Sequence, residues 1–238
     1  ILCLWMRSLK MKKTICNPLS SITMKQFLIV LTVLIVHKGF CQNDPKAENL
    51  LQKVSETINS YDTIGIDFSY LLENRNEDIR QKINGQLLLK DNSYRLDFME
   101  IIQICDGLKT YTIVPENEEV SVNPVSDDDT TTITPNKLLS FYKKGYVLQW
   151  DILQSVMGKK IQFIKLIPID TNSEISYLLL GIDRATYHIH KLIEIGKNKT
   201  QTVLTVNQFR INPNIPSSQF EFNRSDYPDY FIDEYESE

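Results

Sequence analysis

The sequence contains few of the residues from which disulfides, metal centres and phosphate-binding loops are built. Its 238 residues include 4 Cys, 3 His and 8 Gly. The glycines are scattered along the chain, so none of them forms the closely spaced loop that wraps a phosphate group. Beyond residue 41 the only cysteine is Cys105, which has no partner for an intramolecular disulfide. These shortages exclude a disulfide-stapled scaffold and a P-loop nucleotide site for this part of the chain.

Three small groups of side chains remain as candidates for a reactive or metal-binding site. His188 and His190 share one face of an expected strand, but no third ligand accompanies them. Residues 127–129 are three aspartates, which supply the oxygen ligands that Ca²⁺ prefers, without the spacing of a calcium loop. Cys105 has no histidine near it in the sequence to activate its thiol. We therefore expect no enzyme activity, no metal and no cofactor.

Long hydrophobic runs are also missing. The longest, residues 27–36, has ten residues, whereas a helix that crosses a bilayer takes about 20. It follows Lys25 and precedes small residues at 39 and 41, as in a secretory signal peptide. We expect residues 1–41 to be upstream residues plus a signal peptide (core 24–41), with translation starting at Met24 and cleavage after Cys41. A lipid anchor on Cys41 is the alternative, although Phe40 stands where lipidation normally needs a small residue.

The first 41 residues contain six Lys and Arg and no acidic residue. Without them, Lys plus Arg falls from 26 to 20 while Asp plus Glu stays at 30, so the formal charge changes from -4 to -10. An acidic domain without a basic surface is not expected to bind nucleic acid. Residues 42–238 are expected to form one domain, because their number suits a single hydrophobic core. We expect this domain to be a monomer and, after cleavage of the signal peptide, to lie in the periplasm.

Period-two alternation dominates the rest of the chain, most clearly in residues 85–122. Tyr94, Leu96 and Phe98 alternate with charged residues, and after an Asp-Gly turn Tyr111 and Ile113 alternate with threonines. The same pattern predicts strands at 64–72, 81–90, 93–99, 109–114, 119–123, 146–153, 162–167, 175–183, 188–195, 202–210 and 219–222. Because few helices separate these strands, the sheet is expected to be antiparallel.

Two short amphipathic helices are expected, at 45–60 and 135–143. Each begins at a capping residue followed by proline, and the second ends before Gly145. About eleven strands in one sheet curl strongly because of strand twist. The fold class is therefore mainly β (α+β), with two alternatives left open by the pattern. The helices cover an apolar sheet face as a lid, or the sheet closes on itself and the helices pack outside.

Three segments resemble the LolA-like family, the periplasmic carriers of outer-membrane lipoproteins. They are LLLKDNSYRLDF (87–98), ICDGLKTYTI (104–113) and FEFNRSDYPDYFID (220–233), and the order of elements extends the resemblance over residues 45–233. The resemblance implies an unclosed barrel whose helical lid covers a hydrophobic cavity for lipoprotein acyl chains. It also implies an inner-membrane lipoprotein-releasing transporter as donor and an outer-membrane acceptor.

The sequence departs from this family at the residues that join sheet and lid. Proteobacterial members carry an arginine where Asp91 follows Leu89 and Lys90 here, and Arg95 is a possible substitute. Many relatives have tryptophan at the position of Tyr111. These changes leave the fold expectation intact but put the latch between sheet and lid in doubt.

The resemblance and the alternation together define the expected site. The predicted cavity residues are Ile66, Phe68, Tyr70, Leu87, Leu89, Tyr94, Leu96, Phe98, Tyr111 and Ile113, and the predicted lid residues are Leu50, Leu51, Val54, Ile58, Leu138, Leu139, Phe141 and Tyr142. Any one of them is equally compatible with an ordinary packed core. A carrier or sensor for other lipids, or a lipid-anchored envelope protein that binds a partner, remains an alternative function.

Overall fold

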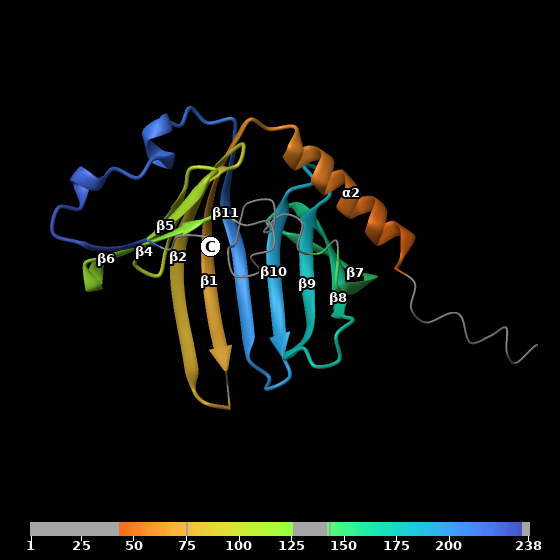
Figure 1. Ribbon diagram of the computed structural model, residues 1–238. Coiled ribbons are helices and arrows are strands. Elements are labelled where there is room, and N and C mark those ends of the chain that lie inside the picture. The colour runs from red at the N-terminus through yellow and green to blue at the C-terminus, as the bar shows by residue number, and fades with distance from the viewer. Residues whose placement is uncertain (1–42, 75, 126–141, 143, 235–238) are drawn as a thin grey trace, which may run out of the picture. The chain divides into compact units, whose positions relative to one another are not determined.

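The computed structural model describes residues 43–234, except 75, 126–141 and 143 (Figure 1). This part of the chain forms one twelve-stranded sheet and one α-helix, α2 (Pro45–Asn59). The strands are β1 (Thr63–Asn74), β2 (Ile79–Lys90), β3 (Ser93–Phe98), β4 (Ile101–Cys105), β5 (Lys109–Val114), β6 (Glu119–Pro124), β7 (Tyr146–Val156), β8 (Lys159–Pro168), β9 (Ile175–Asp183), β10 (Ile189–Gly196), β11 (Gln201–Ile211) and β12 (Phe231–Glu234). Among the described helices, none has the length and hydrophobicity that a membrane span requires.

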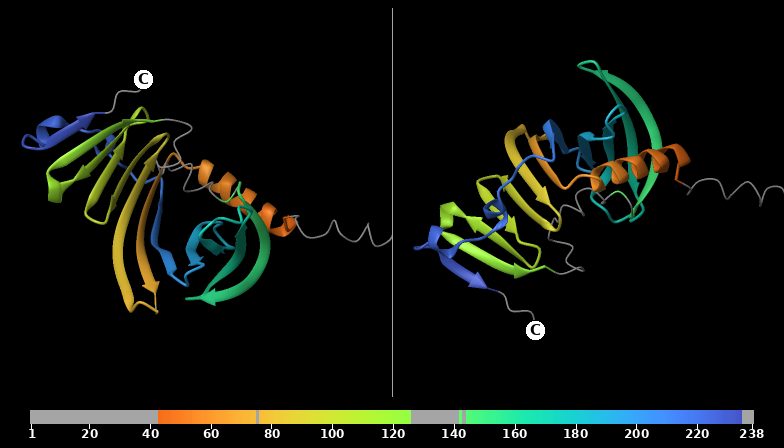
Figure 2. Two further views of the ribbon diagram at one scale, coloured as in Figure 1. Left: turned by 60° about the horizontal axis from the view of Figure 1, so that its bottom comes forward. Right: turned by 90° about the horizontal axis from the view of Figure 1, so that it is seen from above.

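The sheet is curved but not closed. Its strand order is β12-β6-β5-β4-β3-β2-β1-β11-β10-β9-β8-β7, so β12 and β7 are its two edges. All neighbours are antiparallel except β12 and β6, which are parallel. Figure 2 shows β7 and β8 curling round toward α2. The prediction of a mainly β, unclosed barrel with a small helical cover is confirmed, although the single parallel pair is an exception to the predicted antiparallel arrangement.

Most predicted strands are present with bounds shifted by a few residues. Two strands, β4 and β12, are absent from the prediction, and the predicted strand at 219–222 is wrong because Ser217–Phe220 is a 3-10 helix. Strand β4 follows a turn at Met99 and Glu100, both of which have left-handed φ angles, of 54° and 62°. Neither residue type signals such a turn, so no boundary is visible there in the sequence. Strand β12 is only four residues long and carries two acidic residues.

Helix α2 begins at the predicted capping residue and proline. The Asp44 carboxylate accepts a hydrogen bond from the Lys46 backbone N–H at 2.8 Å, and Pro45 occupies the first turn. The helix turns one apolar face toward the sheet, and its buried residues are Ala47, Leu50, Leu51, Val54 and Ile58. These side chains share one hydrophobic core with strands on both halves of the sheet. We call the sheet face that carries α2 the helix face and the opposite one the back face.

The apolar surface changes sides along the sheet. Ile66 of β1, Leu87 of β2 and Leu96 of β3 pair directly across the strands, so their side chains share one face. This is the helix face, because all three pack in the core that contains the buried residues of α2. In β4, β5 and β6 the buried residues lie on the back face and are Ile104, Ile113, Val120 and Val122. The C-terminal segment covers this second core with Phe222, Tyr227, Tyr230 and Ile232. The described chain therefore has two cores, and the first lies under the helix.

Candidate functional site

A wholly apolar cavity of about 230 Å³ lies on the helix face, beside the C-terminal end of α2. It is lined by Ile58, Ile66, Phe68, Tyr70, Leu87, Leu96, Phe98, Leu180, Ile189, Leu192, Leu204, Val206 and Phe209. Every one of these side chains is hydrophobic or aromatic, and they come from α2 and six strands. The described lining contains no charged residue, so the cavity can bind a ligand by burying apolar surface.

A bulge in β11 shapes one wall of this cavity. The pairing between β1 and β11 shifts at Asp67 and Phe68, where Asn207 is the extra residue. Phe209 lies opposite Ile66, and Val206 lies opposite Phe68, so both side chains reach the same face although they are three positions apart. Regular alternation would send one of them to the back face. The bulge thus adds an aromatic ring to the cavity wall.

The floor of the cavity is aromatic. The Phe98 ring lies 5.4 Å from the Phe68 ring and 5.4 Å from the Tyr70 ring, centroid to centroid. Gly85 lies opposite Phe68, and a Cβ at this position would stand 2.3 Å from Cζ of Phe68. A side chain at residue 85 would push the Phe68 ring out of its place. The glycine is therefore required by close packing rather than by a turn.

Tyr61, His188 and Phe209 form a cluster at the end of α2. The Tyr61 hydroxyl and the His188 Nε2 are hydrogen bonded at 2.9 Å, and the His188 ring stacks on Phe209 with centroids 4.0 Å apart. Burial lowers the pKa of His188, which favours the neutral imidazole. Because Phe209 lines the cavity, this cluster joins the α2–β1 turn to the cavity wall.

The other end of α2 is tied to the edge strand β7. The Asp44 N–H donates to the Leu148 carbonyl at 2.9 Å, and the Leu148 N–H donates to Asn43 Oδ1 at 2.9 Å. Tyr142 is buried, and its hydroxyl donates to the Leu51 carbonyl at 3.5 Å. This burial raises the pKa of Tyr142 to about 12. The helix is thus held near both ends and along its middle.

Six of the predicted cavity residues lie together in the cavity: Ile66, Phe68, Tyr70, Leu87, Leu96 and Phe98. Leu89 and Tyr94 are on the same face but pack in the solid core. The structure places Tyr111 and Ile113 differently, in the back-face core, where Tyr111 stacks on Phe222 at 4.6 Å. The predicted alternation within each strand is present, but the register between β3, β4 and β5 turns the apolar residues of β5 to the other face.

The predicted lid residues of α2, Leu50, Leu51, Val54 and Ile58, are all buried against the sheet, and Ile58 lines the cavity. Tyr142 packs in the same core. Leu138, Leu139 and Phe141 lie outside the described residues. The cavity residues that the sequence argument missed come mainly from β9, β10 and β11, where apolar residues occupy both strand faces and alternation gives no signal.

The other candidate sites do not assemble in the described residues, which contain no group of three metal-ligating side chains. His188 is engaged by Tyr61, and residues 127–129 lie outside the described part. Cys105 is buried, and its sulfur accepts from the Gly107 N–H at 3.4 Å. Arg95 pairs with Asp97 at 3.2 Å on the back face, so it does not replace the family's latch to the helix.

Comparison with known proteins gives structural matches only. No family profile matches the sequence, and no curated protein matches it. An uncharacterized conserved protein from Thermus thermophilus is 10% identical, with 80% of this chain and 99% of that chain covered and a TM-score of 0.52. A LolA superfamily protein from Nitrosomonas europaea is 13% identical (74% and 97% covered, TM-score 0.39), and the Mycobacterium tuberculosis lipoprotein LppX is 12% identical (73% and 100% covered, TM-score 0.48).

A LolA superfamily protein is thus one of the solved structures similar to this chain. At these identities the likeness is one of fold. The match to the Thermus protein covers nearly the whole of that chain, so the likeness extends through all of that protein's fold.

Proposed function

We propose that this protein is a carrier of the bacterial periplasm that shelters the acyl chains of lipoproteins and moves them from the inner to the outer membrane. The observation that carries the proposal is the wholly apolar cavity beside the end of α2. An apolar cavity of about 150 Å³ already binds benzene, so one of about 230 Å³ has room for part of an acyl chain. The order of elements shared with LolA-like carriers supports the same function.

The energetics of acyl chains explain why a carrier needs a hollow of this kind. Each methylene transferred from water into an apolar site contributes about 0.8 kcal/mol, so a chain of a dozen or so methylenes gains roughly 10 kcal/mol when fully buried. A lipoprotein with several chains does not cross an aqueous compartment unprotected. The carrier must also release its cargo, so part of this gain has to be offset by a cost of opening.

Under this proposal, the free-energy cost of opening is the cost of moving α2 away from the sheet. Drug-sized ligands occupy pockets of about 300–1,000 Å³, which is more than the present cavity offers. Long chains therefore require α2 to lift from the sheet and to expose the side chains that it now buries. The N-terminal signal peptide, the inner-membrane donor and the outer-membrane acceptor belong to the same proposal. Soluble release after cleavage at Cys41 is the form we propose.

Binding of a fluorescent fatty acid tests the site with a matched pair of variants. Leu192 lines the cavity, whereas its neighbour Ile193 points to the back face, and both side chains are half-buried on β10. Leu192→Glu is expected to weaken binding at least tenfold, which corresponds to about 1.4 kcal/mol, because it places a charge in the cavity. Ile193→Glu is the control and is expected to bind like the wild type. Equal affinities for the two variants would contradict the assignment of the cavity.

Mass spectrometry of lipids that co-purify from the envelope separates the cargo classes. Lipoprotein-derived triacyl or diacyl fragments support the proposed carrier. Glycolipids or free lipids point instead to the alternative, a carrier or sensor for other lipids. Material that neither brings nor takes up any lipid would contradict both.

A further inference from the structure

Strand β2 extends well past its neighbour β3. The pairing of β2 with β1 runs over its whole length, from Ile79 to Lys90, but its pairing with β3 begins only at Gln86. Within the described residues, Ile79–Gly85 therefore has a partner strand on one side only. Figure 1 shows the β1–β2 hairpin reaching beyond β4 and β5. We call the unpaired side of residues 79–85 the open edge.

The backbone groups that face the open edge follow from strand geometry. Lys90 and Ser93 flank a two-residue turn, a position at which the two residues exchange their backbone hydrogen bonds. Even-numbered residues of β2 therefore direct their N–H and C=O groups to the β3 side, and odd-numbered ones to β1. At the open edge these even residues are Arg80, Lys82 and Asn84. They present a row of donors and acceptors that matches an added strand.

A groove runs along this open edge and provides space for a chain. Its volume is about 900 Å³, and it is open to solvent. One wall is formed by Gln81, Ile83 and Asn84 of β2, and the other by residues 97–102 of the β3–β4 hairpin together with Pro115. A strand added to β2 would lie about 4.8 Å from it.

The two outer edges of the sheet are protected more fully than the open edge. On β7, Asn43 and Asp44 cover Leu148, and a bulge at residues 151 and 152 interrupts the pairing. The buried amide of Gln162 bonds the carbonyls of both bulge residues at 2.7 and 3.3 Å. On the other side, β12 is four residues long. Bulges, covers, short strands and charged side chains are the usual protection of edges. In the described part of the chain, residues 79–85 have no bulge and no cover, and their protection consists of the charged side chains of Arg80 and Lys82.

We propose that the open edge of β2 binds an extended strand of a partner protein in which acidic and apolar side chains alternate. Arg80 and Lys82 are exposed on the back-face side of the edge, and Ile79 and Ile83 lie on the helix-face side, with Ile79 41% exposed. Acidic side chains of the partner would lie beside the two basic residues, and its apolar side chains beside the isoleucines. Asp97 and Glu100 also line the groove, and Asp97 is paired with Arg95, so the acidic side chains of the partner would lie on the side of Arg80 and Lys82.

Phe98 connects this groove to the cavity. Its side chain lines the groove on one side and the cavity on the other, where it contacts the Phe68 and Tyr70 rings. A strand bound at the open edge therefore lies against a wall of the cavity. Binding of the strand itself does not depend on the proposed cargo, because the backbone and basic groups that hold the strand lie outside the cavity.

Fluorescence anisotropy with a labelled peptide tests the docking site. The probe is a peptide of about eight residues that alternates glutamate and valine, and the control peptide alternates lysine and valine. The glutamate peptide is expected to bind saturably and the lysine peptide not to bind. Arg80→Glu combined with Lys82→Glu is expected to reverse this preference, whereas Lys160→Glu on the distant β7–β8 hairpin is expected to leave it unchanged. A glutamate peptide that does not bind, or that binds the double variant equally well, would overturn the proposal.

Amide hydrogen exchange locates the peptide on the edge. The amides of Arg80, Lys82 and Asn84 are expected to become protected when the glutamate peptide binds, whereas those of Gln81 and Ile83 are protected by β1 from the start. Lys82→Pro removes one donor that faces solvent, a substitution that edge strands tolerate. It is expected to weaken the peptide at least tenfold and to leave fatty-acid binding unchanged. Protection of the odd-numbered amides instead, or unchanged peptide affinity in a folded Lys82→Pro protein, would refute strand addition.

Discussion

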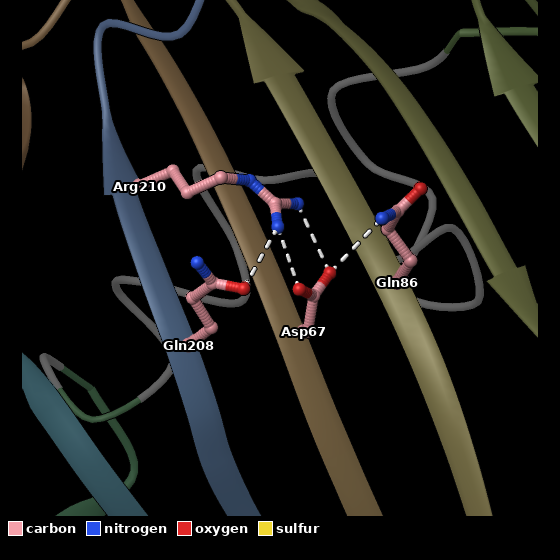
Figure 3. Close-up of polar contacts among 4 residues, drawn as sticks. All are labelled: Asp67, Gln86, Gln208 and Arg210. Carbon is pink, nitrogen blue, oxygen red and sulfur yellow. Dashed lines mark hydrogen bonds and ion pairs between the residues drawn. The ribbon is translucent and has the colours of Figure 1, made fainter.

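The guanidinium of Arg210 holds the carboxylate of Asp67 through two hydrogen bonds, of 2.6 and 3.0 Å, on the back face directly behind the cavity (Figure 3). The Gln86 amide donates to the same carboxylate at 2.9 Å, so one polar group links β11, β1 and β2. Gly65 lies under the guanidinium, where a Cβ would stand 2.8 Å from its Nε. These strands carry the central wall of the cavity. This polar group therefore stabilises the cavity wall on the back face, whereas α2 covers the helix face.

Asp67→Asn is expected to lower the free energy of unfolding by about 1 kcal/mol, measured by urea denaturation at neutral pH. The variant keeps the shape of the side chain but loses the charge that Arg210 pairs with. The expected loss of stability is small because each side chain of the pair is about a third exposed, at 30% and 31%. Glu116→Gln, at an exposed carboxylate in a 3-10 helix, is the control and is expected to change little. Fatty-acid binding should stay unchanged, since Asp67 points away from the cavity.

The effect of Asp67→Asn is expected to disappear in acid. The hydrogen bond from Arg210 lowers the pKa of Asp67 below its ordinary value of 3.8. A depressed pKa in the folded protein contributes stability that is present above the unfolded value and is lost as the pH falls through the folded one. The difference between wild type and variant should therefore be constant from pH 7 down to about 5 and shrink below about pH 4. A difference that persists in strong acid would show that the charge is not its cause.

Gly85→Ala is expected to lower the free energy of unfolding by about 1–3 kcal/mol, as overpacking in a core usually does. The added Cβ would meet the Phe68 ring at 2.3 Å. Phe68→Leu removes the atoms that clash, so the cost of Gly85→Ala should be smaller in that background. A double-mutant cycle followed by urea denaturation measures this coupling. Additive effects of the two substitutions would mean that the clash is relieved elsewhere.

His188 is expected to make stability depend on pH in a window that Asp67 does not affect. Burial lowers its pKa from 6.5, with Asp183 opposing this shift and Lys159 adding to it. Between the folded pKa and 6.5 the unfolded chain binds the proton more readily, so the free energy of unfolding should fall as the pH drops below about 6.5. The pKa of His190 is lowered as well, so the comparison is made in a His190→Gln background. There, His188→Gln is expected to flatten the profile between pH 7 and 5.

The sequence was sufficient for most of the elements and insufficient for their register. Alternation identified Ile66, Leu96 and Phe98 as one apolar face, and Asp44-Pro45 located the start of α2, because both signals are local. The register between strands is not local, and it decides that Tyr111 and Ile113 face backward. The same holds for the bulge that turns Phe209 into the cavity, which no residue type around it announces. Strand register depends on which residues of different strands pair with one another, and these residues are far apart in the chain.

Tyr61→Phe is expected to speed both uptake and release of a fluorescent fatty acid by several-fold in stopped-flow measurements, with little change in Kd. The Tyr61 hydroxyl is bonded to His188 at the end of α2 that lies beside the cavity. Removing this hydrogen bond lowers the free-energy cost of lifting that end of α2 from the sheet. If this opening limits exchange, both the rate of uptake and the rate of release increase. Asn43→Ala loosens the opposite end, at Leu148, and serves as the control. If the N-terminal end were the gate, Asn43→Ala would accelerate exchange and Tyr61→Phe would not. Unchanged rates in both variants would mean that chains enter without movement of α2, and the cost of opening would then have to lie elsewhere in the fold.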